Sequence, residues 1–196
     1  MKIAVATNKG GCAKSTTVVT LARIWRDRQP LIVDTDAQNA TRLFSDVETI
    51  AVRPGDAATI IRAARNDLIL IDCPAHLELS APVLAQADAI LMPIECDILA
   101  LNASVRAFAE LARYYPETPS RAFLSRYNAQ DKANREARDW ARNEWGETLL
   151  KTAIHFRRAF SQAAAAGQTI IDFAPGSLPA RQYENLAMEI KLWLAI

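Results

Sequence analysis

The chain contains a lysine- and glycine-rich segment, residues 9–17, with the composition of a phosphate-binding loop. The adjacent Gly10 and Gly11 allow consecutive backbone N–H groups to turn toward an anion. A helix that begins near Lys14 would add its unpaired N–H groups and the positive end of its dipole. The Lys14 ammonium could then neutralise outer phosphates, and the Ser15 hydroxyl could hold Mg²⁺. A polyphosphate nucleotide fits such a loop.

Acidic residues at two further apolar runs add candidate groups for this chemistry. Asp34 and Asp36 end an apolar run that begins at Leu31, and their spacing places both carboxylates on one side of a strand. Asp72 ends the run 68–71, which is continuously apolar, as expected for a strand buried on both faces. A single acid in this position is otherwise typical of a turn or a helix cap. Since open α/β sheets bind ligands at the carboxyl ends of their strands, we expect these acids near the loop.

The three segments together resemble a known family. The generic phosphate-loop pattern requires glycine where this chain has Asn8 and Ala13, but the chain has an additional lysine, Lys9. The order Lys-Gly-Gly-x-x-Lys-Ser resembles the deviant Walker A motif of the ParA/MinD superfamily. Residues 34–41 resemble the Asp-x-Asp-Pro-Gln-x-x-x-Thr segment of ParA-type ATPases, with alanine replacing proline, and Asp72 resembles the Walker B aspartate. Residues 154–163 and 167–177 are similar to the end of small ParA-type partition ATPases that lack an N-terminal helix-turn-helix domain.

This resemblance implies a role for each site residue. Lys9 would reach across a dimer to the partner's nucleotide, Lys14 would neutralise phosphate charge, and Asp36 would position the attacking water. Asp34 has a more structural interpretation, in which it orients either a Mg²⁺-bound water or a loop. The implied metal-binding residues are Ser15, Asp36 and Asp72. The implied nucleotide-binding residues are Lys9, Gly10, Gly11, Cys12, Ala13, Lys14, Ser15, Thr16 and, as an adenine contact, Pro175.

The elements that must position these residues follow from the pattern of the rest of the chain. Apolar runs alternate with helical patterns, which predicts an α/β fold with a doubly wound, mostly parallel sheet flanked by helices, of the P-loop NTPase type. Strands are expected at residues 3–6, 31–34, 49–52, 68–71, 89–94, 121–127 and 169–173. Helices are expected at residues 14–28, 57–64 with Asp56 as cap, 99–115, 131–145, 157–166 and 180–194.

Length and composition limit the remaining possibilities. With 196 residues, 51% of them hydrophobic, the chain is long enough for one large α/β domain, and we expect residues 1–196 to form that single domain. The sequence shows neither a long apolar span nor a signal-peptide layout, which predicts a cytoplasmic protein. Cys12, Cys73 and Cys96 lack the paired spacing of metal ligands, which argues against a zinc site or a disulfide framework.

A basic helix raises the question of nucleic-acid binding. The net charge of +1 argues against a constitutively polybasic DNA-binding protein. The residues that could contact DNA phosphates are Arg135, Arg138, Arg142, Lys151, Arg157 and Arg158. Acidic residues among the arginines of 131–145 are equally typical of a solvated helix face, so both interpretations stay open from the residues. The resemblance favours non-specific DNA binding.

The resemblance therefore implies a Mg²⁺-dependent ATPase that forms an ATP-sandwich homodimer and drives partition or positioning of plasmid or chromosomal DNA. Its hydrolysis would be slow and accelerated by a ParB-like or adaptor protein, and it would be cytoplasmic and associated with the nucleoid. Three alternatives remain: positioning of another cargo, a MinD-like membrane switch, and a nonhydrolysing nucleotide-dependent scaffold, which Ala13 motivates. A membrane partner is not expected, because the last helical segment carries a single lysine, Lys191.

Overall fold

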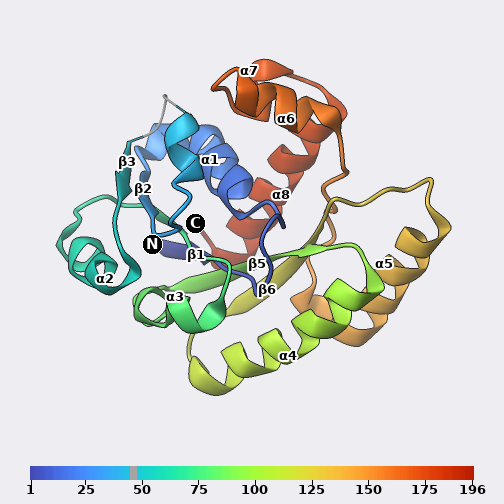
Figure 1. Cartoon of the computed structure of the whole chain (residues 1–196), viewed down its shortest axis with the longest axis horizontal. Coiled ribbons are helices and arrows are strands. Elements are labelled where there is room, and N and C mark those ends of the chain that lie inside the picture. Colours follow the sequence, from blue (N-terminus) through green and yellow to red (C-terminus); the bar gives the residue numbers. More distant parts are fainter. Residues whose placement is uncertain (45–47) are drawn as a thin grey trace.

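The computed structural model describes residues 1–44 and 48–196, and a parallel sheet of six strands forms its centre (Figure 1). The strands are β1 (Lys2–Val5), β2 (Leu31–Asp34), β3 (Thr49–Ala51), β4 (Ile69–Asp72), β5 (Ala89–Glu95) and β6 (Ser120–Ser125). Their spatial order is β3-β2-β4-β1-β5-β6, and every pairing is parallel. From β1 the chain crosses toward the β3 edge of the sheet to reach β2, whereas from β4 it crosses toward the β6 edge to reach β5. A ligand-binding crevice is therefore expected at the carboxyl end of β1.

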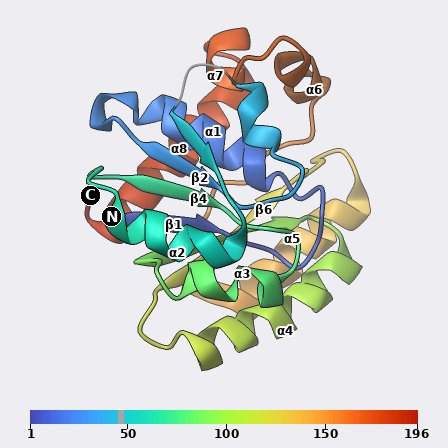
Figure 2. The same cartoon turned by 60° about the vertical axis from the view of Figure 1, so that its left-hand side comes forward.

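Helices cover both faces of this sheet, which confirms the predicted fold class (Figure 2). They are α1 (Lys14–Ile24), α2 (Pro54–Ala63), α3 (Leu77–Leu84), α4 (Ile98–Tyr114), α5 (Lys132–Trp145), α6 (Arg158–Ala165), α7 (Ile170–Phe173) and α8 (Leu178–Leu194). In Figure 2, α1, α6, α7 and α8 lie above the sheet, and α2, α3, α4 and α5 lie below it. In the part of the chain that is described, no helix is long and apolar enough to cross a membrane.

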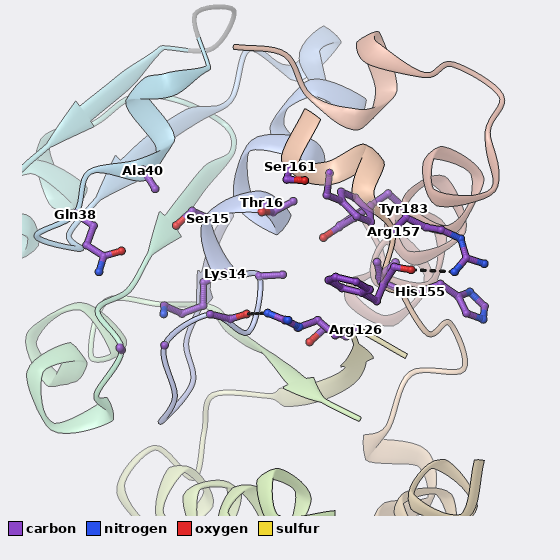
Figure 3. Close-up of a pocket in the computed structure, with 18 of the residues that line it drawn as sticks. Lys14, Ser15, Thr16, Gln38, Ala40, Arg126, His155, Arg157, Ser161 and Tyr183 are labelled. Carbon is purple, nitrogen blue, oxygen red and sulfur yellow. Dashed lines mark hydrogen bonds between the residues drawn. The ribbon is translucent and has the colours of Figure 1, made fainter. Parts of the chain in front are cut away.

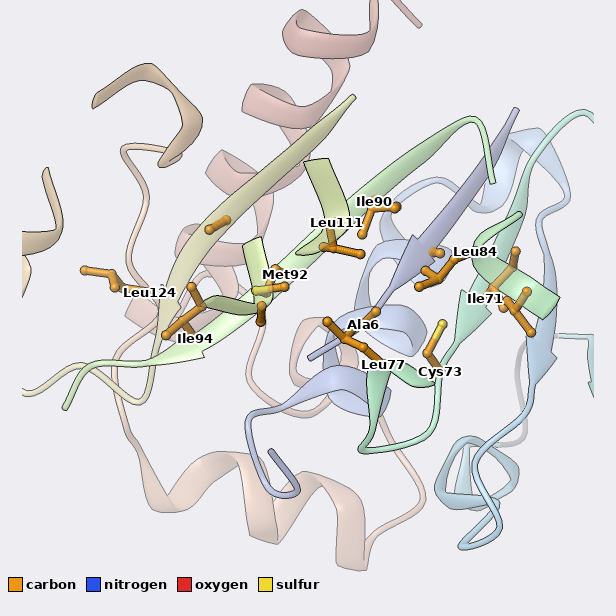
Figure 4. Packing of buried hydrophobic residues seen from close by; sticks show 14 of the residues in the cluster. Ala6, Ile71, Cys73, Leu77, Leu84, Ile90, Met92, Ile94, Leu111 and Leu124 are labelled. Atoms are coloured by element: carbon orange, nitrogen blue, oxygen red, sulfur yellow. The ribbon is translucent and has the colours of Figure 1, made fainter. Parts of the chain in front are cut away.

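Successive strand residues pack into two different cores. In β1, Ile3 and Val5 belong to the core that includes α1 and α8, whereas Ala4 packs on the opposite side, against the core under α3 and α4. Figure 4 shows this second core, with Ile71 and Ile90 from two strands among its residues. Because both faces are buried, the strands read as continuous apolar runs. This packing holds β1 in the centre of the sheet, and the phosphate loop follows the carboxyl end of β1.

The predicted strand at 169–173 is wrong, since Ile170–Phe173 forms the short helix α7. The Thr169 hydroxyl donates a hydrogen bond to Asp172 Oδ2 at 2.7 Å, and Asp172 also pairs with Arg23 of α1, with Arg23 Nη2 2.5 Å from Asp172 Oδ1. These local and tertiary bonds favour a helical turn over the β preference of the isoleucines.

The chain beside β6 comes instead from an earlier segment. Isolated parallel bridges join Ala122 to Leu149 and Tyr127 to His155. Residues 149–155 therefore follow the edge of the sheet next to β6.

Several predicted helix boundaries also differ from the structure. α2 begins at Pro54, so Asp56 lies in its first turn and is not its cap, because proline is favoured at the first helical position. α1 ends at Ile24 and is followed by a 3₁₀ turn at Arg26–Arg28. Helix α3 was not anticipated from the sequence.

Candidate functional site

The segment between β1 and α1 forms a tight loop at the carboxyl edge of the sheet. Gly11 (φ 77°) and Ala13 (φ 70°) both have left-handed backbone conformations. The Ala13 carbonyl accepts hydrogen bonds from the Thr17 N–H at 2.9 Å and from the Thr17 hydroxyl at 2.7 Å, which begins α1. Ala13 provides no side-chain hydrogen bond at this helix start. The first N–H groups of α1 are therefore available to an anion.

A cavity of about 490 Å³ opens in front of this loop, and its two ends differ chemically (Figure 3). Lys14, Ser15 and Asp36 line one end. The aromatic rings of Phe156, Phe160 and Tyr183 line the other. Of the predicted nucleotide- and metal-binding residues, the cavity brings together Gly10, Gly11, Ala13, Lys14, Ser15, Thr16 and Asp36. A molecule with anionic groups at one end and a flat apolar ring at the other matches this arrangement.

Lys14 and Asp36 face each other at the polar end. The Lys14 side chain is only 6% exposed, and its Nζ lies 4.0 Å from Asp36 Oδ2. Asp36 Oδ1 accepts a hydrogen bond from the backbone N–H of Gln38 at 3.0 Å, which fixes the loop that carries it. A buried ammonium and a fixed carboxylate are thus placed side by side where phosphates would enter.

The carboxylate of Asp34 is hydrogen-bonded by its own loop. Its carboxylate accepts hydrogen bonds from the N–H of Asp36 at 3.0 Å, from the N–H of Thr41 at 3.3 Å and from the Thr41 hydroxyl. Of the two roles left open for Asp34, these bonds support the ordering of a loop.

Asp72 has the opposite environment. It is fully buried at the end of β4, and neither carboxylate oxygen has a hydrogen-bond partner among residues 1–44 and 48–196. Burial raises the pKa of Asp72 to about 7, although the neighbouring Ser15 hydroxyl lowers this pKa to a smaller extent. A buried carboxylate without a partner is costly unless a cation compensates it. This environment suits a bound metal ion.

The donor set around Asp72 suits Mg²⁺ in particular. Mg²⁺ commonly binds one or two carboxylates together with substrate phosphates and waters, so it needs no cage made only of protein groups. The described residues contain no group of three or more His, Cys, Asp or Glu that could hold a metal alone. Asp72, Ser15 and Asp36 are the residues that would hold the ion.

Comparison with known proteins identifies the family. Residues 3–170 match the family model described as the CobQ/CobB/MinD/ParA nucleotide binding domain. The chain belongs to this ParA/MinD family. It is 26% identical over 235 residues to the chromosome-partitioning ATPase Soj of Thermus thermophilus, covering 96% of this chain and 94% of that protein.

Solved structures show the same fold. The cell division ATPase MinD of Pyrococcus furiosus superposes with a TM-score of 0.77 at 21% identity, covering 98% of each chain. The MinD of Pyrococcus horikoshii, solved with Mg-ADP, gives a TM-score of 0.75 at 18% identity, covering 98% of this chain and 96% of that one. The family model over residues 3–170 confirms the predicted resemblance to the ParA/MinD superfamily.

Three of the predicted nucleotide-binding residues of this ParA/MinD-family chain lie outside the residues that line the cavity. Lys9 is 57% exposed and pairs with Glu95 at a distance of 2.5 Å between Nζ and Oε2. Cys12 is buried beneath the loop, and its burial raises the pKa of the thiol. Pro175 is exposed between α7 and α8. The roles assigned to these three residues stay predictions.

The six basic residues predicted to contact DNA lie at three different places. Arg135 and Arg138 lie on the N-terminal half of α5, where Arg138 pairs with Asp139 and donates a hydrogen bond to the Tyr127 hydroxyl at 2.9 Å. Arg142 and Lys151 line a separate groove, while Arg157 and Arg158 line the cavity in front of the phosphate loop. DNA binding by these residues stays a prediction.

Sequence reasoning missed most of the aromatic end of the cavity. Phe156 and Phe160 flank the start of α6, and their four-residue spacing was the available signal. Tyr183 of α8 is fully buried, and its hydroxyl lies 3.1 Å from the Thr17 hydroxyl of α1. Arg126 has a left-handed backbone (φ 55°) and stacks on Phe156, 5.1 Å from the ring centre. These residues meet only through the tertiary fold, which the motifs do not describe.

Proposed function

We propose that this chain is a Mg²⁺-dependent ATPase that forms a nucleotide-sandwich homodimer, binds DNA without sequence preference, and drives partition or positioning of plasmid or chromosomal DNA. The observation that carries the proposal is the two-ended cavity, which the phosphate loop, Lys14 and Asp36 line. Asp72, whose buried carboxylate has no hydrogen-bond partner within residues 1–44 and 48–196, adds to it. The named relatives Soj and MinD support ATP as the nucleotide. The P. horikoshii MinD structure with Mg-ADP supports Mg²⁺.

Each group of the cavity has a defined task in this reaction. The backbone of the loop and the Lys14 ammonium bind the phosphates and neutralise the charge that builds up on them. Bound Mg²⁺ would supply further neutralisation of that charge, held by Ser15, Asp36 and Asp72. Asp36 also orients the attacking water. The aromatic end orients the base by stacking, so that the phosphates reach the loop in one position.

Lys9 acts on a second subunit. It is exposed and does not line its own cavity, so its ammonium is accessible to the phosphates of a facing copy. It would partly perform the role of an arginine finger supplied in trans. ATP binding and dimer formation are then one coupled equilibrium, and hydrolysis releases the subunits.

DNA and a partner protein complete the proposed cycle. The dimer brings together the basic residues of α5 from both subunits. It therefore contacts more DNA phosphates, and binds DNA more tightly, than a single subunit does. A ParB-like or adaptor protein would accelerate a slow intrinsic hydrolysis. The protein would then be cytoplasmic and associated with the nucleoid.

Sedimentation velocity with ADP, ATP and a slowly hydrolysed ATP analogue tests the switch. We expect the wild type to dimerise only with ATP or the analogue, Lys9→Ala to stay monomeric with every nucleotide, and Asp36→Ala to persist as an ATP-bound dimer. A Lys9→Ala protein that dimerises normally would refute the proposed role in trans. Dimerisation of the wild type without measurable ATP turnover would instead select the nonhydrolysing scaffold.

DNA binding is tested on the analogue-bound dimer with duplexes of unrelated sequence at several salt concentrations. Neutralising Arg135 and Arg142 to alanine should weaken binding to all duplexes equally and reduce the salt dependence. Arg62→Ala, which removes an exposed arginine from the last turn of α2, is the matched control and should change neither. An affinity that does not respond to salt would exclude phosphate contacts.

A further inference from the structure

Lys9 does not extend freely into solvent, because a carboxylate of its own subunit holds it. Glu95 is the last residue of β5, and its Oε2 lies 2.5 Å from Lys9 Nζ. This hydrogen bond raises the pKa of Lys9, and burial opposes it to a smaller extent. The ammonium that must reach a second subunit is therefore already engaged.

Glu95 has a second cationic partner on its other oxygen. Arg126 Nε lies 3.4 Å from Glu95 Oε1, while Lys9 occupies Oε2. The Glu95 side chain is 25% exposed, less than either cation. If Lys9 left, the carboxylate would keep one ion pair, and the cost of a partly buried unpaired charge would be avoided.

Arg126 is itself fixed in place by contacts that do not involve Lys9. Its Nη1 donates a hydrogen bond to the Gly11 carbonyl of the phosphate loop at 3.3 Å, and its guanidinium stacks on Phe156. Its left-handed backbone is uncommon for a residue other than glycine and persists only where the surroundings determine it. Arg126 therefore remains beside Glu95 whether or not Lys9 does.

We propose that Glu95 is a positioning residue that holds Lys9 within the isolated subunit, and that ATP-dependent dimerisation transfers Lys9 from Glu95 to the partner's nucleotide while Arg126 retains Glu95. This inference rests on the proposed function, since it requires Lys9 to act in trans. The ion pair with Glu95 then competes with dimer formation. A stronger ion pair between Lys9 and Glu95 would raise the ATP concentration that dimer formation requires.

The substitution Glu95→Gln separates this proposal from a purely structural role. Without the carboxylate, Lys9 needs to break no ion pair, so the analogue-bound dimer should be about two- to fivefold tighter, the range of a partly exposed ion pair. If Glu95 instead stabilised the dimer or the fold around it, Glu95→Gln would weaken the dimer. The two roles therefore predict changes of opposite sign.

Two measurements on wild type, Glu95→Gln and a control complete the test. The control is Glu136→Gln, which removes the carboxylate of an exposed ion pair with Lys132 on α5. The first measurement is acetylation of the Lys9 amine in nucleotide-free protein, followed by peptide mass spectrometry. Glu95→Gln should speed this acetylation about two- to fivefold, and Glu136→Gln should not change it. An unchanged rate would overturn the proposal at the level of the single subunit.

The second measurement is the dimer dissociation constant by sedimentation with the slowly hydrolysed ATP analogue. A lower constant for Glu95→Gln alone supports the exchange. An unchanged or higher constant, in a protein whose wild type dimerises, overturns the exchange and leaves the nucleotide-driven dimer intact. A wild type that never dimerises overturns the proposed function and this inference together.

Discussion

Ala13 occupies a backbone position that normally requires glycine, so its replacement by glycine should stabilise the protein. Its φ of 70° and ψ of 28° lie in the left-handed region. For a residue with a Cβ this region costs roughly 1–2 kcal/mol. Glycine removes that cost but loses about 0.4–1 kcal/mol through the greater freedom of the unfolded chain. We expect Ala13→Gly to raise the free energy of unfolding by about 0.5–1 kcal/mol.

Thermal or urea unfolding without nucleotide measures this effect. For a chain of this size the expected rise in Tm is about 1–4 °C. The matched control is Ala109→Gly on the exposed face of α4, where the backbone is helical and the same substitution should cost about 0.5–1 kcal/mol. If Ala13→Gly lowers the Tm as the control does, the strain inferred at Ala13 is absent.

The same variant decides whether the methyl group slows catalysis. The hydrogen bond from the Thr17 N–H to the Ala13 carbonyl, 2.9 Å long, shows that the start of α1 is intact despite the alanine. Since Ala13 also lines the cavity, its methyl group can affect the fit of the phosphates. An increase in kcat for Ala13→Gly would show that this fit limits turnover, and an unchanged kcat would make the alanine a neutral substitution.

Three further predictions concern the metal, an ion pair and the base. Asp72→Asn should abolish most of the additional thermal stabilisation that Mg²⁺ gives beyond ADP alone, and a full Mg²⁺ increment would place the ion elsewhere. Asp172→Asn should cost about 1–2 kcal/mol at pH 7 by breaking the pair with Arg23. Burial raises the pKa of Asp172, but hydrogen bonds from Arg23 and Thr169 outweigh burial and lower the pKa overall. The stabilisation is therefore present above about pH 4 and is lost as the pH falls through the lowered pKa. Urea unfolding at pH 7 and pH 3 should show that the stability difference between wild type and Asp172→Asn shrinks in acid. Phe156→Ala should weaken binding of a fluorescent ADP analogue about three- to tenfold, and an unchanged affinity would exclude stacking of the base there.

The sheet and the phosphate loop could be predicted because their signals are local. The central strands β1, β2, β4 and β5 have both faces buried or nearly so, and this produces apolar runs that are visible without knowledge of the partners. The loop follows from a short sequence in which glycine, lysine and serine have the order and spacing that phosphate binding requires. The same reasoning failed at residues 169–173, where Asp172 binds Arg23 across the fold and a single strand-like segment could not reveal that contact.

The aromatic end of the cavity could not be predicted, because its residues meet only in the folded chain. Arg126, Phe156 and Tyr183 belong to three segments that meet only after the sheet is covered. Arg126 and Tyr183 lie outside the recognised segments, and the resemblance of residues 154–163 gave Phe156 no role. The left-handed backbone of Arg126 is invisible in the sequence, because nothing there distinguishes this arginine from the others.

Asp34 and Asp72 show how the structure separates two acids that the sequence presents alike. They are partners in register on neighbouring strands, both end an apolar run, and both are fully buried. Asp34 accepts three hydrogen bonds from its own loop, whereas both oxygens of Asp72 have no partner within the described ranges. A buried charge that is satisfied stabilises the fold, and one that is unsatisfied destabilises it until a ligand arrives. The unpaired acid is therefore the one whose environment suits a bound cation.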